Sequence, residues 1–198
     1  MPDGVVGFEP RSVFHVYNRG VARARIFPRA GFYVFFLLRV RRYFHRPDTA
    51  VLAYCLMPNH FHLLLEVNKN GLSKGMHGLQ MSYAKAVNQE LRRVGPIFQG
   101  RYQAKLVNTD EQLLHLTRYI HLNPVGAGLV ARPDQWLYSS YRSYLGGESA
   151  RWVETKVVLD VLAPGKSMSG QRSRYRDFVA QPTEESNLAI STPRRGQK

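Results

Sequence analysis

The fold of this 198-residue chain is decided by one stretch, Val51-Leu52-Ala53-Tyr54-Cys55-Leu56-Met57-Pro58-Asn59-His60-Phe61-His62-Leu63-Leu64-Leu65-Glu66-Val67. It holds two apolar runs, residues 51–56 and 61–67, separated by Met57-Pro58-Asn59-His60. Proline and asparagine are typical turn residues, and two apolar runs joined by such a turn predict a β-hairpin. We therefore expect His60 at the start of the second strand.

The segments on either side of this hairpin predict two more strands and two helices. Residues 12–18 are β-branched and aromatic and lead into Asn18-Arg19-Gly20, which indicates a strand and then a turn. Residues 28–44 begin with a proline and repeat aromatic side chains at helical spacing, and residues 72–93 form a long run without proline. Residues 98–107 alternate as a strand does.

The next segment predicts one more helix. Thr109-Asp110-Glu111-Gln112 has the spacing of a capping box, and the buried stripe that follows predicts a helix to about Leu122. Pro124 disfavours the helical state at Asn123, so the helix is expected to end or kink there. The order strand, helix, hairpin, helix, strand, helix predicts an α+β sandwich, with helices on one face of an antiparallel sheet.

The C-terminal part predicts an extension rather than a second domain. Short helices are expected at residues 154–162 and 171–180, and the chain beyond Pro182 is polar and expected to be disordered. The expected organisation is a main domain over residues 1–146, a helical extension over 147–181 and a basic tail over 182–198.

The charge of the chain points to a nucleic acid. Lys and Arg number 28 against 14 Asp and Glu, which gives a net charge of +14 and a pI near 10.3. Charge alone does not distinguish DNA from RNA. An anionic membrane surface would call for an amphipathic helix with basic residues on one face or a lipid signal, and neither is clear.

Cysteine usage and hydropathy indicate the compartment. The single cysteine, Cys55, excludes an intrachain disulfide and a multi-cysteine zinc site. The most apolar stretch, residues 32–38, is too short to span a bilayer. We therefore expect no membrane partner and a cytoplasmic protein associated with the nucleoid.

His60 and His62 form the first candidate site. On a strand their side chains project from one face with Cα atoms roughly 6.5 to 7 Å apart, close enough to share one ion. The alternative is two structural histidines, and only a third ligand from elsewhere in the chain would favour a metal site.

Tyr119 and Asn123 form the second candidate site. Their i, i+4 spacing puts both side chains on one face of the predicted helix. The alternative is a solvated face on which Tyr119 lays its ring against the core edge. Taken with the histidines, an ion held by two imidazoles and one amide oxygen could polarise a phosphodiester while a phenol attacks it.

Five ordered blocks between residues 12 and 146 resemble the IS200-like transposases, and in particular their REP-associated tyrosine transposase branch. The His-hydrophobic-His block lies within Ala53–Leu64. The others are Phe14-His15-Val16-Tyr17-Asn18-Arg19-Gly20, Gly95-Pro96-Ile97-Phe98-Gln99-Gly100-Arg101-Tyr102, Arg118-Tyr119-Ile120-His121-Leu122-Asn123-Pro124 and Ser139-Ser140-Tyr141.

The resemblance implies a ferredoxin-like fold and a Mg²⁺ or Mn²⁺ ion at the histidine pair. By position, His60 and His62 are implied as metal ligands, with Asn123 as the third. Tyr119 is the implied nucleophile, taking a 5′-phosphate and freeing a 3′-hydroxyl. Tyr83, on another predicted helix with Asn88 five residues later, is the rival nucleophile. His15 and His121 are expected to be structural or to lie beside DNA.

The implied activity is that of a transposase, a DNA strand transferase with single-strand endonuclease activity. Its expected partner is single-stranded DNA that contains a hairpin, and a monomer or a homodimer is left open. The cations expected to follow the DNA backbone are Arg19, Arg23, Arg25, Arg101 and Lys105, with Arg92 and Arg93 as further candidates. Candidates for base stacking, at least half of them expected in the core, are Tyr102, Trp136, Tyr138, Tyr141 and Tyr144.

Two other functions remain open at this stage. The first is a nucleic-acid-binding regulator that keeps the fold and no longer cleaves. The second is a metal-dependent nuclease that uses water, whose activity would survive the loss of every tyrosine.

Overall fold

The computed structural model describes residues 12–45, 49–67, 71–147 and 150–181. The predicted tail, residues 182–198, lies outside the described residues. In chain order the elements are β1 (Ser12–Arg19), η1 (Val21–Arg23), α1 (Ala30–Phe44), β2 (Thr49–Met57), β3 (His60–Val67), α2 (Gly71–Glu90), β4 (Gln103–Val107), α3 (Asp110–Gly126), η2 (Pro133–Gln135), α4 (Tyr141–Tyr144), α5 (Lys156–Leu162) and α6 (Met168–Ala180).

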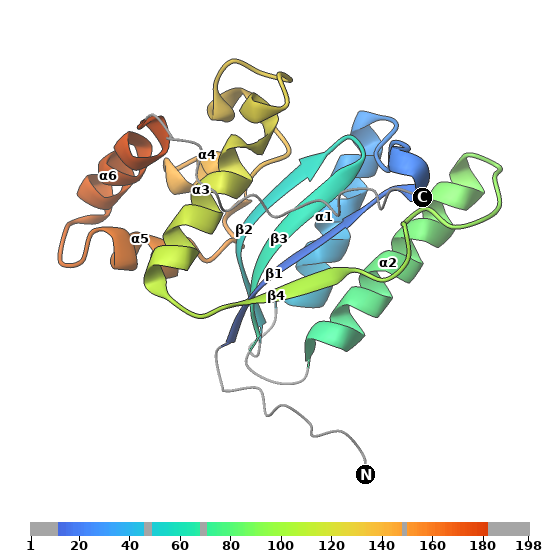
Figure 1. The fold of residues 1–198 in the computed structure, drawn as a ribbon, viewed down its shortest axis with the longest axis horizontal. Helices are drawn as coiled ribbons and strands as arrows, with labels where there is room; N and C mark the ends of the chain where they lie inside the picture. Colours follow the sequence, from blue (N-terminus) through green and yellow to red (C-terminus); the bar gives the residue numbers. More distant parts are fainter. Residues whose placement is uncertain (1–11, 46–48, 68–70, 148–149, 182–198) are drawn as a thin grey trace, which may run out of the picture.

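The four strands form one antiparallel sheet in the order β2-β3-β1-β4 (Figure 1). The strand β3 lies between β1 and β2, and β1 lies between β3 and β4, so each crossover helix joins two strands that run in the same direction with one strand between them. Such split β-α-β units are the pattern of a ferredoxin-like sandwich. The predicted α+β class and antiparallel sheet are confirmed.

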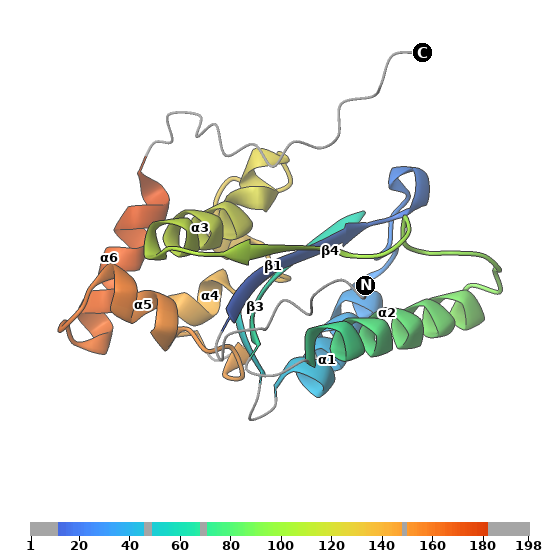
Figure 2. The same cartoon turned by 60° about the horizontal axis from the view of Figure 1, so that its bottom comes forward.

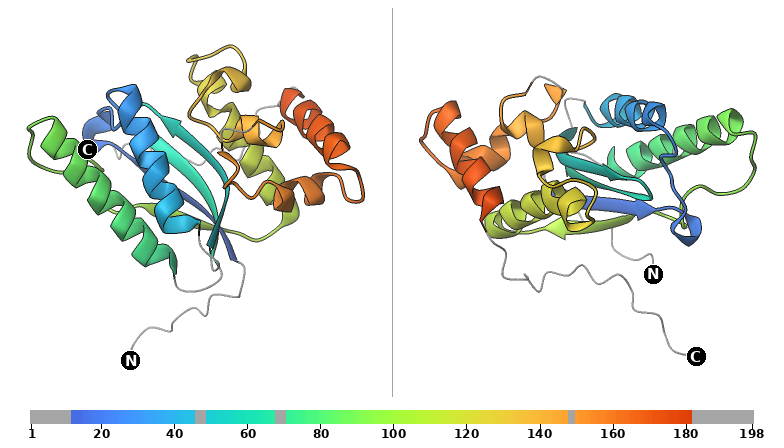
Figure 3. Two further views of the ribbon diagram at one scale, coloured as in Figure 1. Left: turned by 180° about the vertical axis from the view of Figure 1, so that it is seen from behind. Right: turned by 90° about the horizontal axis from the view of Figure 1, so that it is seen from above.

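The helices α1 and α2 lie together on one face of the sheet (Figures 2 and 3). Their contact depends on two glycines of α2. A Cβ atom on Gly75 would lie 2.6 Å from the ring of Phe44, and one on Gly78 would lie 2.6 Å from the ring of Tyr43. The absence of a side chain at both positions therefore lets the aromatic rings at the end of α1 pack directly on the backbone of α2.

The predicted hairpin is confirmed, with Met57 paired to His60 across its turn. The carbonyl of Pro58 accepts hydrogen bonds from the backbone N–H groups of Ile26 (2.9 Å) and Phe27 (3.1 Å), which fixes the turn against the segment before α1. Because strand side chains alternate, Phe61 packs against Phe36 of α1 while its neighbours face away from that helix.

The helix α3 departs from the prediction at its end. It continues through Asn123 and Pro124 to Gly126, so the expected stop at Asn123 is wrong. A proline this close to the C-terminus of a helix removes only one late backbone hydrogen bond, and the buried Pro124 ring adds apolar contact. The predicted start is confirmed, because the Thr109 hydroxyl accepts a hydrogen bond from the Gln112 amide at 3.1 Å.

The last strand is also shorter than predicted. The expected strand over residues 98–107 begins only at Gln103. Phe98 is buried, with its ring in contact with those of Phe61 and Tyr83, and Gly100 adopts a φ of 76° that turns the chain before the strand starts. Phe98 keeps an isolated antiparallel bridge to Gly20, and the turn at Gly100 separates this bridge from the continuous strand.

The chain after α3 covers the free edge of β2. The amide of Leu56 donates to the carbonyl of Tyr138 (2.9 Å), and the amide of Ser140 donates to that of Tyr54 (3.0 Å). This covers an edge that would otherwise expose unpaired backbone groups. Trp136 adds a hydrogen bond from its indole nitrogen to the carbonyl of Leu56.

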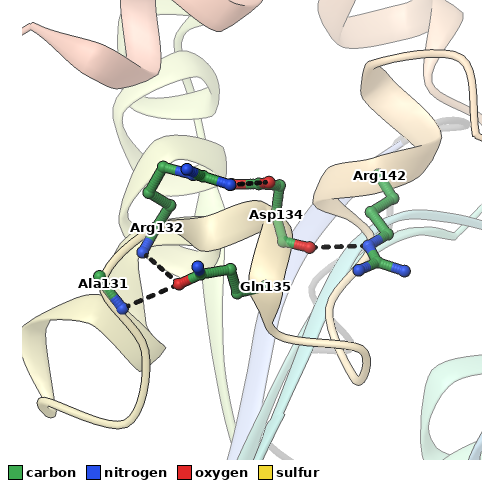
Figure 4. A network of polar contacts seen from close by, with 5 residues as sticks. All are labelled: Ala131, Arg132, Asp134, Gln135 and Arg142. Atoms are coloured by element: carbon green, nitrogen blue, oxygen red, sulfur yellow. Dashed lines mark hydrogen bonds and ion pairs between the residues drawn. The ribbon is translucent and has the colours of Figure 1, made fainter.

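A surface network braces the turn that leads into this edge segment (Figure 4). Arg132 pairs with Asp134, and the side chain of Gln135 accepts hydrogen bonds from the amides of Ala131 and Arg132. Arg142 of α4 donates to the backbone carbonyl of Asp134 at 2.7 Å. The network therefore ties η2 to α4 and fixes the direction of the chain between them.

The predicted C-terminal extension forms α5 and α6, which begin two and three residues from the expected starts, and both pack against α3. A buried histidine of α3, His121, links this helix to α6 and to the segment before α4. Nδ1 of His121 lies 2.7 Å from the hydroxyl of Tyr175 on α6, and its Nε2 lies 2.7 Å from Oγ of Ser140. The extension therefore braces α3 through the buried ring of His121.

Candidate active site

The two histidines of β3 lie on the face of the sheet opposite to α1 and α2. Their ring centroids are 5.1 Å apart with the planes nearly perpendicular. His62 is buried and His60 partly buried. The predicted sharing of one face by His60 and His62 thus agrees with the register of the strand.

The helix α3 brings the second candidate pair to the first. Oδ1 of Asn123 lies 3.3 Å from Nε2 of His60. The ring of Tyr119 meets that of His62 edge-on, with centroids 5.5 Å apart. The phenol also remains reachable, since Tyr119 is 40% exposed. The contact between α3 and β3 therefore brings four side chains together in one cluster: His60, His62, Tyr119 and Asn123.

Burial sets the protonation state of the two imidazoles. It lowers the pKa of His60, an effect that the amide oxygen of Asn123 opposes because it stabilises the protonated ring. It lowers the pKa of His62 well below the usual value, with smaller contributions from the neighbouring His15 and His60. Both imidazoles are therefore neutral near pH 7, the form in which a ring nitrogen can bind a metal ion.

The donor set fits a small divalent cation. Two imidazole nitrogens and one amide oxygen leave positions open for water or phosphate oxygens. Ligands at adjacent corners of an octahedron around an ion at about 2.1 Å stand roughly 3 Å apart, close to the separation of the Asn123 oxygen and the His60 nitrogen. No group of three or more His, Cys, Asp or Glu residues with metal-binding geometry occurs in the described part of the chain, so this set depends on the amide.

The rival nucleophile lies elsewhere. Tyr83 is fully buried on α2, and its hydroxyl donates to the carbonyl of Ile26 at 2.5 Å. Burial raises the pKa of the Tyr83 phenol above its usual range. Tyr83 faces Phe36 and Phe98 in the core, on the opposite side of the sheet from the histidines.

Two of the predicted DNA-binding cations lie on the same face of the sheet as the cluster. In the register of the sheet Arg19 is paired with His60, and Lys105 with His15, so both project from the histidine face. Arg23 and Arg25 are exposed in the turn after β1, and Arg101 is exposed just before β4. The further candidates, Arg92 and Arg93, follow α2 instead.

Of the five predicted stacking residues, two are buried, fewer than the expected half or more. Tyr141 and Tyr144 are buried beside His121, so they belong to the core. Tyr138 stacks on Tyr33 with ring centroids 3.9 Å apart and is partly exposed, as are Trp136 and Tyr102.

Two neighbours of the histidine pair were missed as site residues. Nε2 of His15 lies 2.9 Å from Nδ1 of His62, and Oδ1 of Asn59 lies 2.8 Å from Nδ1 of His60. Burial, and then the charge of Lys105, lowers the pKa of His15 to about 4. The strand alternation of His15 could have placed it on a histidine face, but only the pairing of β1 with β3 sets it beside His62.

Comparison with known proteins identifies the class to which this fold and site belong. Residues 13–123 match the family model described as "Transposase IS200 like". The match covers more than half of the chain, which belongs to the IS200-like transposase family. No helix among the residues that the structure describes is long and apolar enough to cross a membrane.

Two individual proteins are similar to this chain. The chain is 29% identical over 111 residues to the "Putative REP-associated tyrosine transposase" of Haemophilus influenzae, a match that covers 49% of this chain and 61% of that protein. The chain therefore spans about three fifths of the curated relative that it matches. A solved structure of a REP-associated tyrosine transposase bound to a REP hairpin shares the fold, with a TM-score of 0.59, 17% identity and coverage of 74% of this chain and 86% of the other.

Proposed function

We propose that this transposase nicks single-stranded DNA and rejoins it through a 5′-phosphotyrosine intermediate, with Mg²⁺ or Mn²⁺ as cofactor. The observation that carries the proposal is the position of Tyr119 and Asn123 on α3, over the two histidines of β3. Membership of the transposase family makes strand transfer the activity that such a cluster would serve.

Three of the site residues would bind the metal ion in the proposed reaction. His60, His62 and Asn123 would hold the ion. When bound, the ion would supply positive charge to a phosphodiester and so lower the cost of the charge that builds up during attack. The neutral imidazoles and the amide oxygen need no proton loss to serve as ligands at neutral pH.

Tyr119 would act as the nucleophile. A bond forms between its phenolic oxygen and phosphorus, the bond from phosphorus to the 3′-oxygen breaks, and the phenolic proton leaves to solvent or to the released 3′-oxygen. In rejoining, a 3′-hydroxyl attacks phosphorus, the bond to Tyr119 breaks, and the phenol regains a proton. The phosphotyrosine ester conserves the bond energy, so no external energy source is needed.

The proposed substrate is single-stranded DNA with a hairpin. Arg19 and Lys105 lie on the histidine face, and the exposed Arg23, Arg25 and Arg101 lie near its edges, where they could follow a phosphate backbone. The hairpin is proposed from the related structure, which holds a REP hairpin.

The test is a denaturation-resistant protein–DNA adduct. The protein is incubated with Mn²⁺ or Mg²⁺ and labelled single-stranded hairpin DNA, as wild type and as Tyr119→Phe. We expect an adduct in the wild type and none in the variant. Binding without adduct or cleavage in the wild type would favour the non-cleaving regulator, and cleavage that persists in Tyr119→Phe without an adduct would favour a nuclease that uses water.

A further inference from the structure

Asn59, the last residue of the hairpin turn, makes two hydrogen bonds that together fix its orientation. Its Nδ2 atom donates to the carbonyl oxygen of Arg23 at 3.3 Å, and its Oδ1 atom lies 2.8 Å from Nδ1 of His60. A carbonyl oxygen can only accept, so the amide nitrogen of Asn59 must face Arg23 and the amide oxygen must face the imidazole. The Nδ1 atom of His60 is therefore the donor.

The proton on Nδ1 determines which nitrogen of His60 can bind a metal ion. A neutral imidazole carries one N–H group and one lone pair, so with the proton on Nδ1 the lone pair of His60 is on Nε2. That nitrogen is the one that faces Asn123 at 3.3 Å. An amide oxygen faces each nitrogen of His60, and the neutral ring can donate to only one of them. Donation to Asn59, at the shorter distance of 2.8 Å, leaves the Nε2 lone pair and the Asn123 oxygen facing each other, as two ligands of one ion would.

His15 contacts the Nδ1 atom of the second histidine, His62, as Asn59 contacts the Nδ1 atom of His60. Its Nε2 atom lies 2.9 Å from Nδ1 of His62, and the two rings are stacked with centroids 5.1 Å apart. His15 is 1% exposed, and its other face stacks on Tyr17 at 5.0 Å. A neutral imidazole has one N–H group and one lone pair, so Nε2 of His62 can meet an ion only when Nδ1 of His62 donates and Nε2 of His15 accepts.

We infer that Asn59 and His15 are positioning residues for a divalent cation: each engages the Nδ1 atom of one histidine and so directs that histidine's Nε2 atom into the site. The inference rests on the proposed function, because it assumes an ion at His60 and His62. Groups that hold the second nitrogen of a metal-binding histidine commonly change metal affinity 10- to 100-fold when they are removed.

The bond from Asn59 also anchors the chain before α1. Arg23 has a φ of 62° and Ala22 a φ of 50°, both in the left-handed region that non-glycine residues rarely adopt. The amide of Gly20 donates to the backbone carbonyl of Asn59 at 2.8 Å. The side chain of Asn59 therefore links two parts of the chain. One is the turn of Ala22 and Arg23, which has positive φ angles, and the other is the ring of His60.

The first test measures Mn²⁺ binding to the DNA-free protein by electron paramagnetic resonance. We expect Asn59→Ala and His15→Phe each to weaken binding about 10- to 100-fold. Asn59→Asp keeps an acceptor for His60, and His15→Gln keeps a polar atom for His62, so both should bind within a few-fold of the wild type. Controls of the same residue types are Asn88→Ala, whose amide bonds Gly95, and His77→Gln, which is exposed on α2.

The second test reads the imidazole nitrogens directly. In the metal-free protein, ¹⁵N chemical shifts of the histidine rings should show His60 protonated on Nδ1, and Asn59→Ala should shift that signal toward a mixture of tautomers. Mn²⁺ affinities of Asn59→Ala and His15→Phe equal to that of the wild type, or His60 protonated on Nε2, would overturn the inference.

The two tests separate failure of the inference from failure of the proposed function. If the proposed function is wrong, wild type and His60→Ala will bind Mn²⁺ equally weakly, and the inference about an ion falls with it. If only the inference is wrong, the wild type will bind the ion, His60→Ala will not, and the Asn59 and His15 variants will bind as the wild type does. Circular dichroism and thermal unfolding identify any variant that fails to fold.

Discussion

The amide oxygen of Asn123 and Nε2 of His60 lie 3.3 Å apart although 63 residues separate them in the chain. The contact joins the C-terminal half of α3 to the first residue of β3. It is the point at which a helix from the second half of the chain completes the histidine pair of the first.

Asn123 should contribute its oxygen to metal binding and to strand cleavage. We expect Asn123→Ala to weaken Mn²⁺ binding and to slow adduct formation about 10-fold or more, while Asn123→Asp retains an oxygen donor and most of the activity. The measurements are Mn²⁺ titration and single-turnover adduct formation. Asn108→Ala, at an exposed position just before α3, is the matched control, and equal activity of both alanine variants would remove Asn123 from the site.

Tyr83 should matter for stability and not for chemistry. Tyr83→Phe removes the hydroxyl that bonds the carbonyl of Ile26, so we expect a loss of about 1 to 2 kcal/mol in the free energy of unfolding. Adduct formation at a temperature where the variant is folded should match the wild type. An adduct lost in Tyr83→Phe and kept in Tyr119→Phe would reverse the assignment of the nucleophile.

The cations of the histidine face should appear in the salt dependence of DNA binding. If Lys105 contacts a phosphate, Lys105→Ala should weaken single-stranded DNA binding and reduce the slope of log K against log salt by about 0.7. Fluorescence anisotropy between low and moderate salt measures that slope. The control is Lys85→Ala, because Lys85 is exposed on α2 behind the other face of the sheet. An unchanged slope for Lys105→Ala would place the DNA path elsewhere.

His121 should make the protein less stable as the pH falls. Burial lowers the pKa of His121 from 6.5 to about 3, so below pH 6.5 the unfolded chain binds a proton that the folded chain does not. Stability is therefore lost as the pH falls from 6.5 toward 3, and this one group should remove about 3 kcal/mol between pH 8 and pH 4.

Urea unfolding at a series of pH values tests the contribution of His121. His121→Gln should be less stable at pH 8, because the bonds to Tyr175 and Ser140 are perturbed, yet its stability should fall less steeply toward pH 4. The exposed His77→Gln serves as the control and should follow the wild-type curve. Parallel curves for His121→Gln and wild type would contradict the lowered pKa.

Features that depend on a single element could be predicted from the sequence. The turn residues between two apolar runs specified the hairpin, and the two-residue period of a strand put His60 and His62 on one face. The helical spacing of four put Tyr119 and Asn123 side by side, and the ordered blocks of the chain indicated the transposase family.

Which of these elements meet could not be predicted from the sequence and depends on tertiary packing. The docking of α3 beside β2 and β3 brought Tyr119 and Asn123 to the histidines, while α2 carried Tyr83, an equally plausible tyrosine by sequence, into the core on the opposite face. The pairing of β1 with β3 likewise set His15 beside His62. Side-chain direction follows from backbone geometry within a few residues, whereas contacts between elements depend on how the whole core packs.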